Sequence, residues 1–217
     1  MSEPVQAADV PAPDPDDSMP DPWKVRHFDP DVGGPDFGRL LAAFRDLQDS
    51  FVAAAPPLAQ MVPMAARIEA LAAEFAEWEG TEFHVPAGMR NDLPGRGSAM
   101  MLPIVFDEVT DERVSGHVTF RRFHLGGNGA AHGGTLPLMF DDVIGRLVNT
   151  AGRAVARTAY LTVNYRRITR IGANLRFDAT MDRVEGRKRW ASGRLWHGDD
   201  LVADADGLFI ELRPGQP

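Results

Sequence analysis

The chain has 217 residues, of which 44% are apolar and 25% are charged, and its formal net charge is −8 at pH 7. This length predicts one large domain or one domain with appendages, and the apolar fraction is sufficient for a packed core. Cysteine is absent, which excludes disulfides, thiol nucleophiles and cysteine-bound zinc and agrees with a cytoplasmic location. The six histidines form no HExxH pattern, so we expect no metal. No apolar run is long enough to span a membrane, and no secretion signal precedes residue 35.

The charge is unevenly distributed along the chain. Residues 1–112 contain 7 basic and 21 acidic side chains, whereas residues 113–190 contain 14 basic and 5 acidic side chains. A basic middle in an acidic protein predicts an anionic ligand there, and the acidic remainder argues against nucleic acid as a partner.

The first 80 residues predict a tail followed by helices. Residues 1–35 are rich in Pro and Asp and predict a disordered acidic tail. Residues 36–80 predict an N-terminal helical extension, because apolar residues recur at helical spacing over 36–54 and 58–79. Pro56-Pro57 separates the two helices, and Gly80 ends the second.

Residues 81–217 predict an α+β domain. Two strands, one of them over 114–121, are followed by a glycine-rich turn over 126–134 and a helix over 135–151. Four further strands are expected at 155–168, 173–184, 187–197 and 201–212. Short turns imply antiparallel neighbours, and a single long helix with an apolar face packs against the concave side of such a sheet. This pattern predicts the hotdog fold, an antiparallel sheet wrapped around one long central helix.

The strongest local feature is His132-Gly133-Gly134 at the start of that helix. Glycine permits close approach of a backbone N–H to a ligand, and a helix N-terminus offers free N–H groups and a positive dipole end. Together they suit a developing oxyanion. The alternative is that the two glycines only form the turn into the helix.

Asp141 and Asp142 lie on the same predicted helix. Asp142 is four residues before Arg146, which predicts a surface ion pair. Asp141 lies next to the apolar stripe, where a lone carboxylate is costly unless it has a role. The alternative for Asp141 is a helix-surface acid or the partner of a nearby arginine.

The segment HGGTLPLMFD, residues 132–141, resembles the HGG-x6-D signature of hotdog acyl-CoA thioesterases. This superfamily includes the phenylacetate-pathway and 4-hydroxybenzoyl-CoA enzymes. Similarity continues in TAYLTVNYRR (158–167), VEGRK (184–188) and ADADGLFIEL (203–212), covers about 113–213, and is strongest to the mitochondrial long-chain branch. The resemblance implies roles for four residues. Asp141 is the general base or nucleophile, Gly133 N–H polarises the thioester carbonyl, Thr158 helps to hold water, and His132 orients the loop or the thioester.

The same resemblance implies hydrolysis of a medium- to long-chain fatty acyl-CoA to free acid and CoA, without a cofactor, since coenzyme A is part of the substrate. Gly134 is expected to contact the substrate. Asn128 is a further candidate, although it is nearer the histidine than the carbonyl-binding asparagine of some relatives. Arginine and lysine suit the phosphates of CoA, or they are solvated strand ends. The basic candidates are Arg166, Arg167, Arg187 and Lys188, with Arg170 and Arg189 beside them.

Several alternatives remain open. The acyl group could be aromatic, or the chain could be a non-catalytic acyl-CoA-binding protein; a hydratase would need an Asp-His pair that the turn lacks. The N-terminal helices cover the core or brace an interface, or they form a lid over an acyl pocket. Gly133 and Asp141 are about 12 Å apart along a helix, so one carbonyl cannot contact both. We therefore expect a homodimer or tetramer with sites shared between chains.

Overall fold

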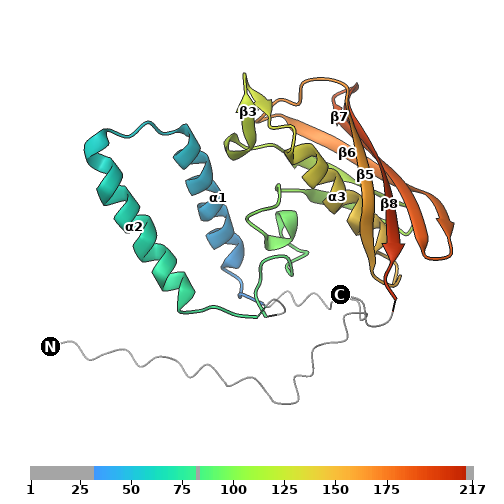
Figure 1. Cartoon of the computed structure of the whole chain (residues 1–217), viewed down its shortest axis with the longest axis horizontal. Helices are drawn as coiled ribbons and strands as arrows, with labels where there is room; N and C mark the ends of the chain where they lie inside the picture. Colours follow the sequence, from blue (N-terminus) through green and yellow to red (C-terminus); the bar gives the residue numbers. More distant parts are fainter. Residues whose placement is uncertain (1–31, 82–83, 214–217) are drawn as a thin grey trace, which may run out of the picture.

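The computed structural model describes residues 32–81 and 84–213, so most of the predicted tail lies outside the described residues. A six-stranded antiparallel sheet curves around one helix, α3 (Thr135–Val148), in the order β1-β2-β6-β7-β8-β5 (Figure 1). The predicted α+β hotdog architecture is confirmed. The strands are β1 Val105–Val109, β2 Arg113–Thr119, β5 Ala156–Tyr165, β6 Asn174–Glu185, β7 Lys188–His197 and β8 Asp200–Glu211.

The core lies between α3 and the concave face of the sheet. Helix α3 buries apolar side chains at three- and four-residue spacing, and alternate residues of β2, β6, β7 and β8 meet them. Gly193 of β7 lets the helix approach closely, because a Cβ there would lie 3.0 Å from the Phe140 ring. The central members are Val118, Phe120, Leu136, Met139, Phe140, Val143, Ile144, Leu147, Leu175, Phe177, Leu195 and Phe209.

Helix α3 ends at Val148, three residues before the predicted end. The Asn149 side chain donates to Gly145 O at 2.9 Å and accepts from Ala156 N at 2.7 Å, which turns the chain directly into β5. Ala151, three residues beyond the helix, adopts a left-handed conformation with φ 59° in the turn that leads to β5.

The helical extension consists of α1 (Phe37–Ala53) and α2 (Leu58–Ala76), close to the predicted bounds. Helix α1 is anchored to the domain by buried Arg45, which donates to Pro94 O and Ser98 O at 3.0 Å. Helix α2 buries no residue and lies on the far side of α1 from the sheet (Figure 1). It therefore does not cover the core of this protomer. Among the described residues, no helix combines the length and apolar character needed to cross a bilayer.

Candidate active site

The turn that carries His132 is built by a small hairpin within the predicted glycine-rich turn. Strands β3 (Leu125–Gly127) and β4 (Ala130–Ala131) follow a short 3-10 helix, η2 (Arg122–His124). His132 N donates to His124 O at 2.7 Å. Gly126 permits this contact, since a Cβ there would lie 2.7 Å from His132 Cα. Sequence reasoning did not identify His124 or Gly126, because their role depends on this hairpin.

The His132 ring orients the turn itself. Gly134 N donates to His132 Nδ1 at 3.1 Å, and Thr135 donates to His132 O through both N and Oγ1, at 2.9 and 2.6 Å. Gly134 is the residue that precedes α3, with φ −68°. The turn is thus held by hydrogen bonds on both sides of Gly133.

Gly133 is held by a residue that the sequence did not single out. Tyr165, at the end of β5, donates its phenol O–H to Gly133 O at 2.8 Å. Within the described part of the chain, no acceptor is bonded to Gly133 N–H. A fixed peptide with an available N–H beside a helix N-terminus can stabilise negative charge on an oxygen.

The structure brings two of the candidate site residues, Asp141 and Thr158, into contact. Thr158 Oγ1 donates to Asp141 Oδ1 at 2.7 Å, and both residues are exposed. Thr158 is near the start of β5, whereas Tyr165 is at its end. An exposed carboxylate next to a hydroxyl can accept a proton from water, or it can attack a carbonyl directly.

The predicted surface position of Asp142 is wrong, although Arg146 does interact electrostatically with its carboxylate. Asp142 is buried, and its carboxylate pairs with Arg96 at 2.5 Å. Burial raises the pKa of Asp142, and Asp141 raises it further, whereas Arg96 and Arg146 act in the opposite direction. The cause is the segment 84–104, which was not predicted to cover this face of α3. Arg96 extends from a left-handed position in this segment, with φ 56°.

The basic residues fall into two groups at opposite ends of the sheet. Arg166 forms a forked ion pair with Asp204, 2.9 Å at its shortest, and Arg167 pairs with Asp200 at 3.1 Å. Lys188 is exposed and lies opposite Ile210 in the sheet. Since Arg166 N bonds to Val202 O, the two groups are about 25 Å apart along β8.

Arg189 is not available for coenzyme A. It is 4% exposed and donates to Val148 O and Ala154 O at 2.8 Å, and it pairs with Glu211 at 2.6 Å. It therefore joins the end of α3 to the sheet. Arg187 remains exposed and donates to Glu211 O at 2.7 Å.

Asn128 occupies the tip of the β3–β4 hairpin. Its φ is 49°, a left-handed conformation that asparagine tolerates better than most residues, and it lies between Gly127 and Gly129. The left-handed conformation explains why an asparagine occupies this position. No hydrogen bond among the described residues joins Asn128 to Gly133.

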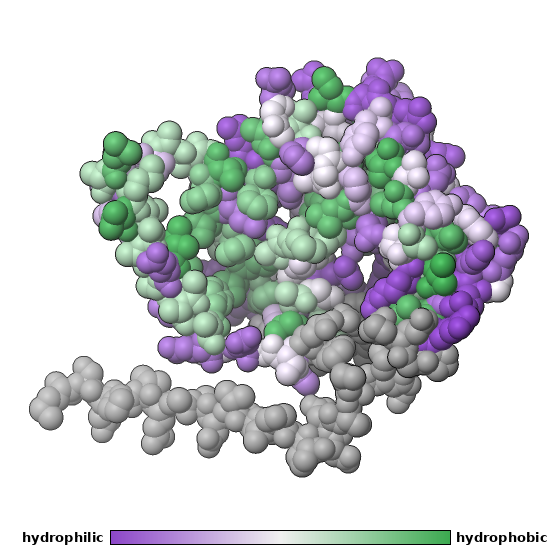
Figure 2. All heavy atoms as spheres, in the orientation of Figure 1, coloured by the Kyte–Doolittle hydropathy of each residue, from purple (hydrophilic) through white to green (hydrophobic). Residues whose placement is uncertain are grey.

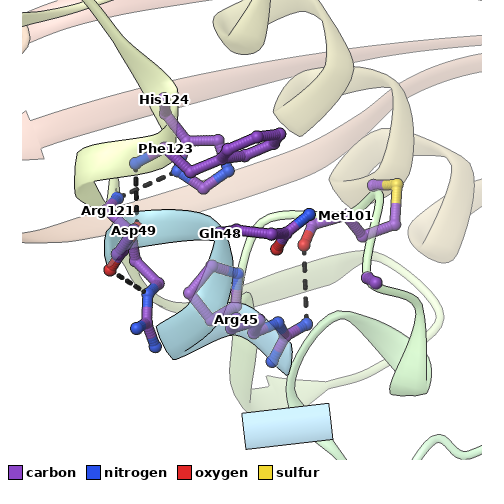
Figure 3. A pocket seen from close by; sticks show the side chains of 9 residues that line it. Arg45, Gln48, Asp49, Met101, Arg121, Phe123 and His124 are labelled. Carbon is purple, nitrogen blue, oxygen red and sulfur yellow. Dashed lines mark hydrogen bonds and ion pairs between the residues drawn. The ribbon is translucent and has the colours of Figure 1, made fainter. Parts of the chain in front are cut away.

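The cavities of the single chain lie elsewhere. A cavity of about 10 Å³ between α1 and η2 is lined by Arg45, Asp49, Arg121 and His124, among others, and holds one water at most (Figure 3). An open groove of about 610 Å³ lies beside Arg153, beyond the C-terminal end of α3. Gly133, Asp141 and Thr158 line neither of them, and all three are exposed in the described part of the chain.

Comparison with known proteins finds similarity to one family over part of the chain. Residues 128–203 match the model of the thioesterase superfamily. Two similar proteins are described as acyl-coenzyme A thioesterase THEM4. The Bos taurus protein is 34% identical over 88 residues, and the Xenopus laevis protein is 35% identical over 89. Each match covers 40% of this chain but only 35% and 39% of the relatives, so the aligned segment spans little more than a third of their length.

A solved structure extends the comparison. The crystal structure of protein RHA08564, a thioesterase superfamily protein, has a TM-score of 0.69 and 23% identity, over 81% of this chain and 90% of that one. At this identity the likeness shows the fold alone. The matched part, 81% of the chain, is larger than the hotdog domain. Residues 128–203 are thus similar in sequence to the thioesterase superfamily, and they lie within a domain that has the hotdog fold.

Proposed function

We propose that this chain is an acyl-CoA thioesterase that works as a homodimer, with each active site shared between two copies. The observation that carries the proposal is the position of two hydrogen-bonded pairs, Thr158 with Asp141 and Tyr165 with Gly133. The first pair joins the middle of α3 to the start of β5, and the second joins the turn before α3 to the end of β5. The matched family and the activity printed for the two THEM4 relatives support the thioester substrate.

The separation of the two pairs supports a composite site. Gly133 and Asp141 are about 12 Å apart by helix rise, and Thr158 and Tyr165 are about 20 Å apart by strand rise. A thioester carbonyl must be within about 3 Å of its oxyanion donor. If two α3 helices lie antiparallel across a two-fold axis, Gly133 of one copy comes beside Asp141 of the other, and two equivalent sites form.

The two basic groups fit the same arrangement. Arg166 follows Tyr165 and lies at the Gly133 end of β5, whereas Lys188 lies two strands from Thr158, at the Asp141 end. In one copy they are too far apart to bind one coenzyme A together. Across the proposed two-fold axis, Arg166 of one copy and Lys188 of the other flank the same site, where both can bind phosphate.

The chemistry follows from these contacts. Asp141, oriented by Thr158, removes a proton from a water molecule while the water oxygen attacks the thioester carbon. The carbonyl oxygen gains the negative charge, which Gly133 N–H of the other copy stabilises. When the intermediate collapses, the carbon–sulfur bond breaks and CoA leaves as a thiolate that takes up the proton. In the alternative route, the Asp141 carboxylate attacks the thioester carbon, the carbon–sulfur bond breaks and CoA leaves as a thiolate that is then protonated. Water hydrolyses the resulting anhydride to the free acid and restores the carboxylate.

A panel of acyl-CoA substrates assayed for released thiol tests this proposal. We expect hydrolysis of medium- to long-chain fatty acyl-CoA; preference for an aromatic acyl-CoA would instead assign the second substrate class. Asp141→Asn should lose activity by 100-fold or more, as loss of a general base does. Asp199→Asn, an exposed turn residue, is the matched control and should remain active. Binding of palmitoyl-CoA without turnover would show a binding protein and overturn the proposal.

A further inference from the structure

Helix α2 is an apolar helix that no other described segment of the chain covers. The eight large apolar side chains of residues 58–78 are between 40% and 88% exposed, and α2 buries no residue. Figure 2 shows hydrophobic residues gathered over this helix and the neighbouring α1. A surface helix in a complete structure buries its apolar stripe.

The apolar residues of both helices follow the spacing of a helical bundle. On α2 the stripe consists of Met61, Met64, Ile68, Leu71 and Phe75, which alternate steps of three and four. On α1 the same spacing connects Leu40, Phe44, Leu47 and Phe51. This is the repeat by which helices pack side chains into the gaps of a neighbouring helix.

Helix α1 already uses a different face to reach its own domain. Its buried residues, Leu41 and Arg45, lie about a third of a turn away from the Leu40–Phe51 stripe. Asp49 of α1 adds an ion pair with Arg121 at 2.8 Å and accepts from Phe123 N at 2.8 Å. The hairpin of α1 and α2 is therefore fixed to the domain by one side, and its apolar stripes remain open.

We propose that the α1–α2 hairpin binds the same hairpin of a second copy of this chain. In this arrangement α2 packs antiparallel against α2 of the second copy across a two-fold axis, and the pair completes a four-helix bundle. This surface lies outside the catalytic contacts, and the inference does not depend on the proposed thioesterase activity.

The exposed area agrees with a stable interface between copies. The nine apolar side chains of the two stripes are between 38% and 68% exposed. At roughly 200 Å² for a fully exposed large side chain, they present on the order of 800 Å². This exceeds the largest apolar patch of a typical monomer, about 300–600 Å², and reaches the roughly 800 Å² that each partner contributes to a stable interface.

The charge of the hairpin favours a second copy over an anionic membrane. Helix α2 contains only Arg67, Glu69 and Glu74 as charged residues. Helices that bind anionic lipid surfaces are rich in lysine and arginine on their polar face. Two apolar, nearly neutral surfaces of the same shape satisfy each other in a two-fold contact, because such an interface must be complementary to itself.

Sedimentation velocity of the full chain tests this inference. Ile68→Glu with Leu71→Glu places two charges in the stripe and should weaken association roughly 100-fold or more, giving a smaller species. Ala66→Glu with Ala73→Glu adds the same charge to the opposite face of α2 and should leave the mass unchanged. Neither variant should lower the Tm of the domain, because α2 contributes nothing to its core. Equal masses for all three proteins would overturn the inference.

A second measurement locates the contact. Since the chain has no cysteine, Ile68→Cys and Ala66→Cys each introduce one thiol. Ile68 is near the middle of α2 and should meet its own copy close to the axis, so a short bismaleimide should join Ile68→Cys chains in pairs and leave Ala66→Cys chains single. Equal yields would contradict the contact. A wild-type chain that is monomeric but binds neutral phosphatidylcholine vesicles would also overturn it, in favour of a lipid surface.

Thiol release in the same samples separates this inference from the proposed function. If the stripe variant becomes smaller but stays active, the hairpin and the active site use different contacts. If it loses activity on dilution and regains it at high concentration, they share one two-fold axis. Both results support the hairpin contact. A wild-type chain that assembles through the hairpin but hydrolyses no acyl-CoA leaves this inference intact and overturns the proposed function alone.

Discussion

Thr158 Oγ1 donates a 2.7 Å hydrogen bond to Asp141 Oδ1, which connects the start of β5 to the exposed side of α3. The carboxylate is thereby held in one orientation, and its second oxygen stays free for a water molecule or a thioester carbon. The hydroxyl can also accept a hydrogen bond from that water, which positions it for attack.

Thr158→Val keeps the shape of the side chain and removes the hydroxyl. A hydrogen bond to a charged group contributes about 1.5–3 kcal/mol, so we expect kcat to fall roughly 10- to 100-fold. Thr158→Ser restores the hydroxyl and should recover most of the activity. Steady-state thiol release measures both, and a valine variant as active as wild type would remove Thr158 from the mechanism.

Tyr165→Phe tests whether the phenol positions the Gly133 N–H. We expect kcat to fall several-fold, because a neutral hydrogen bond contributes about 1 kcal/mol, while KM changes little. The chain offers a matched control, since its only other tyrosine, Tyr160, lies on the same strand and forms none of the hydrogen bonds described. Tyr160→Phe should behave as wild type. Equal effects of both substitutions would indicate a loss of strand packing instead.

Arg187→Glu with Lys188→Glu tests the coenzyme A contact; buried Arg189 is left intact. Charge reversal should raise KM for acyl-CoA more than it lowers kcat, because remote phosphate contacts bind substrate and transition state equally. An acyl-pantetheine thioester lacks the nucleotide and should be hydrolysed nearly as well as by wild type. If both substrates are affected equally, these residues serve the fold or the assembly.

We expect the stability of the folded chain to depend on pH because of buried His124. Burial lowers its pKa below the ordinary 6.5, with further lowering by Arg121 and Arg45, against the opposing effect of Asp49. Its Nδ1 accepts from Arg121 N at 2.9 Å, which requires the unprotonated nitrogen.

Below about pH 6.5 the unfolded chain therefore binds a proton before the folded chain does, and stability is lost as pH falls. The Tm of His124→Gln should decrease less between pH 8 and 5.5 than that of wild type. His197→Gln, at the exposed end of β7, should follow wild type. If the Tm of His124→Gln decreased with pH as much as that of wild type, His124 would not be the source of the pH dependence.

The sheet and its central helix could be predicted from the sequence, whereas the contacts between residues far apart in the chain could not. Period-two strands and the apolar face of residues 135–151 predicted the sheet and its central helix, and the spacing from Gly133 to Asp141 predicted a site too long for one carbonyl. The pairing of Arg96 with Asp142 joins residues 46 positions apart through an irregular segment. No periodicity marks such a contact.

The same limit applies to the basic residues. Arg187, Lys188 and Arg189 are consecutive and read as one cluster, yet the strand turns Arg189 inward beneath Glu211 and leaves the other two exposed. Successive side chains of a strand point to opposite faces of the sheet, so the sequence predicts that neighbouring residues differ in exposure. Which of these side chains is buried depends on where α3 ends, and the sequence does not give that position.

The most direct test of the shared site uses two inactive variants. Gly133→Pro removes the N–H two residues before the start of α3, where no backbone hydrogen bond of the described residues is lost, and Asp141→Asn removes the carboxylate. Each variant alone should be nearly inactive. Chains carrying two distinguishable tags first show, by joint capture, that subunits exchange.

In an equal mixture of Gly133→Pro and Asp141→Asn, half the dimers are mixed, and each mixed dimer has one site with both substitutions and one with neither. Thiol release from the mixture should therefore recover to about a quarter of the wild-type rate. If exchange is shown and no activity returns, Gly133 and Asp141 of one chain serve the same site, and the account of a site shared between two copies is wrong.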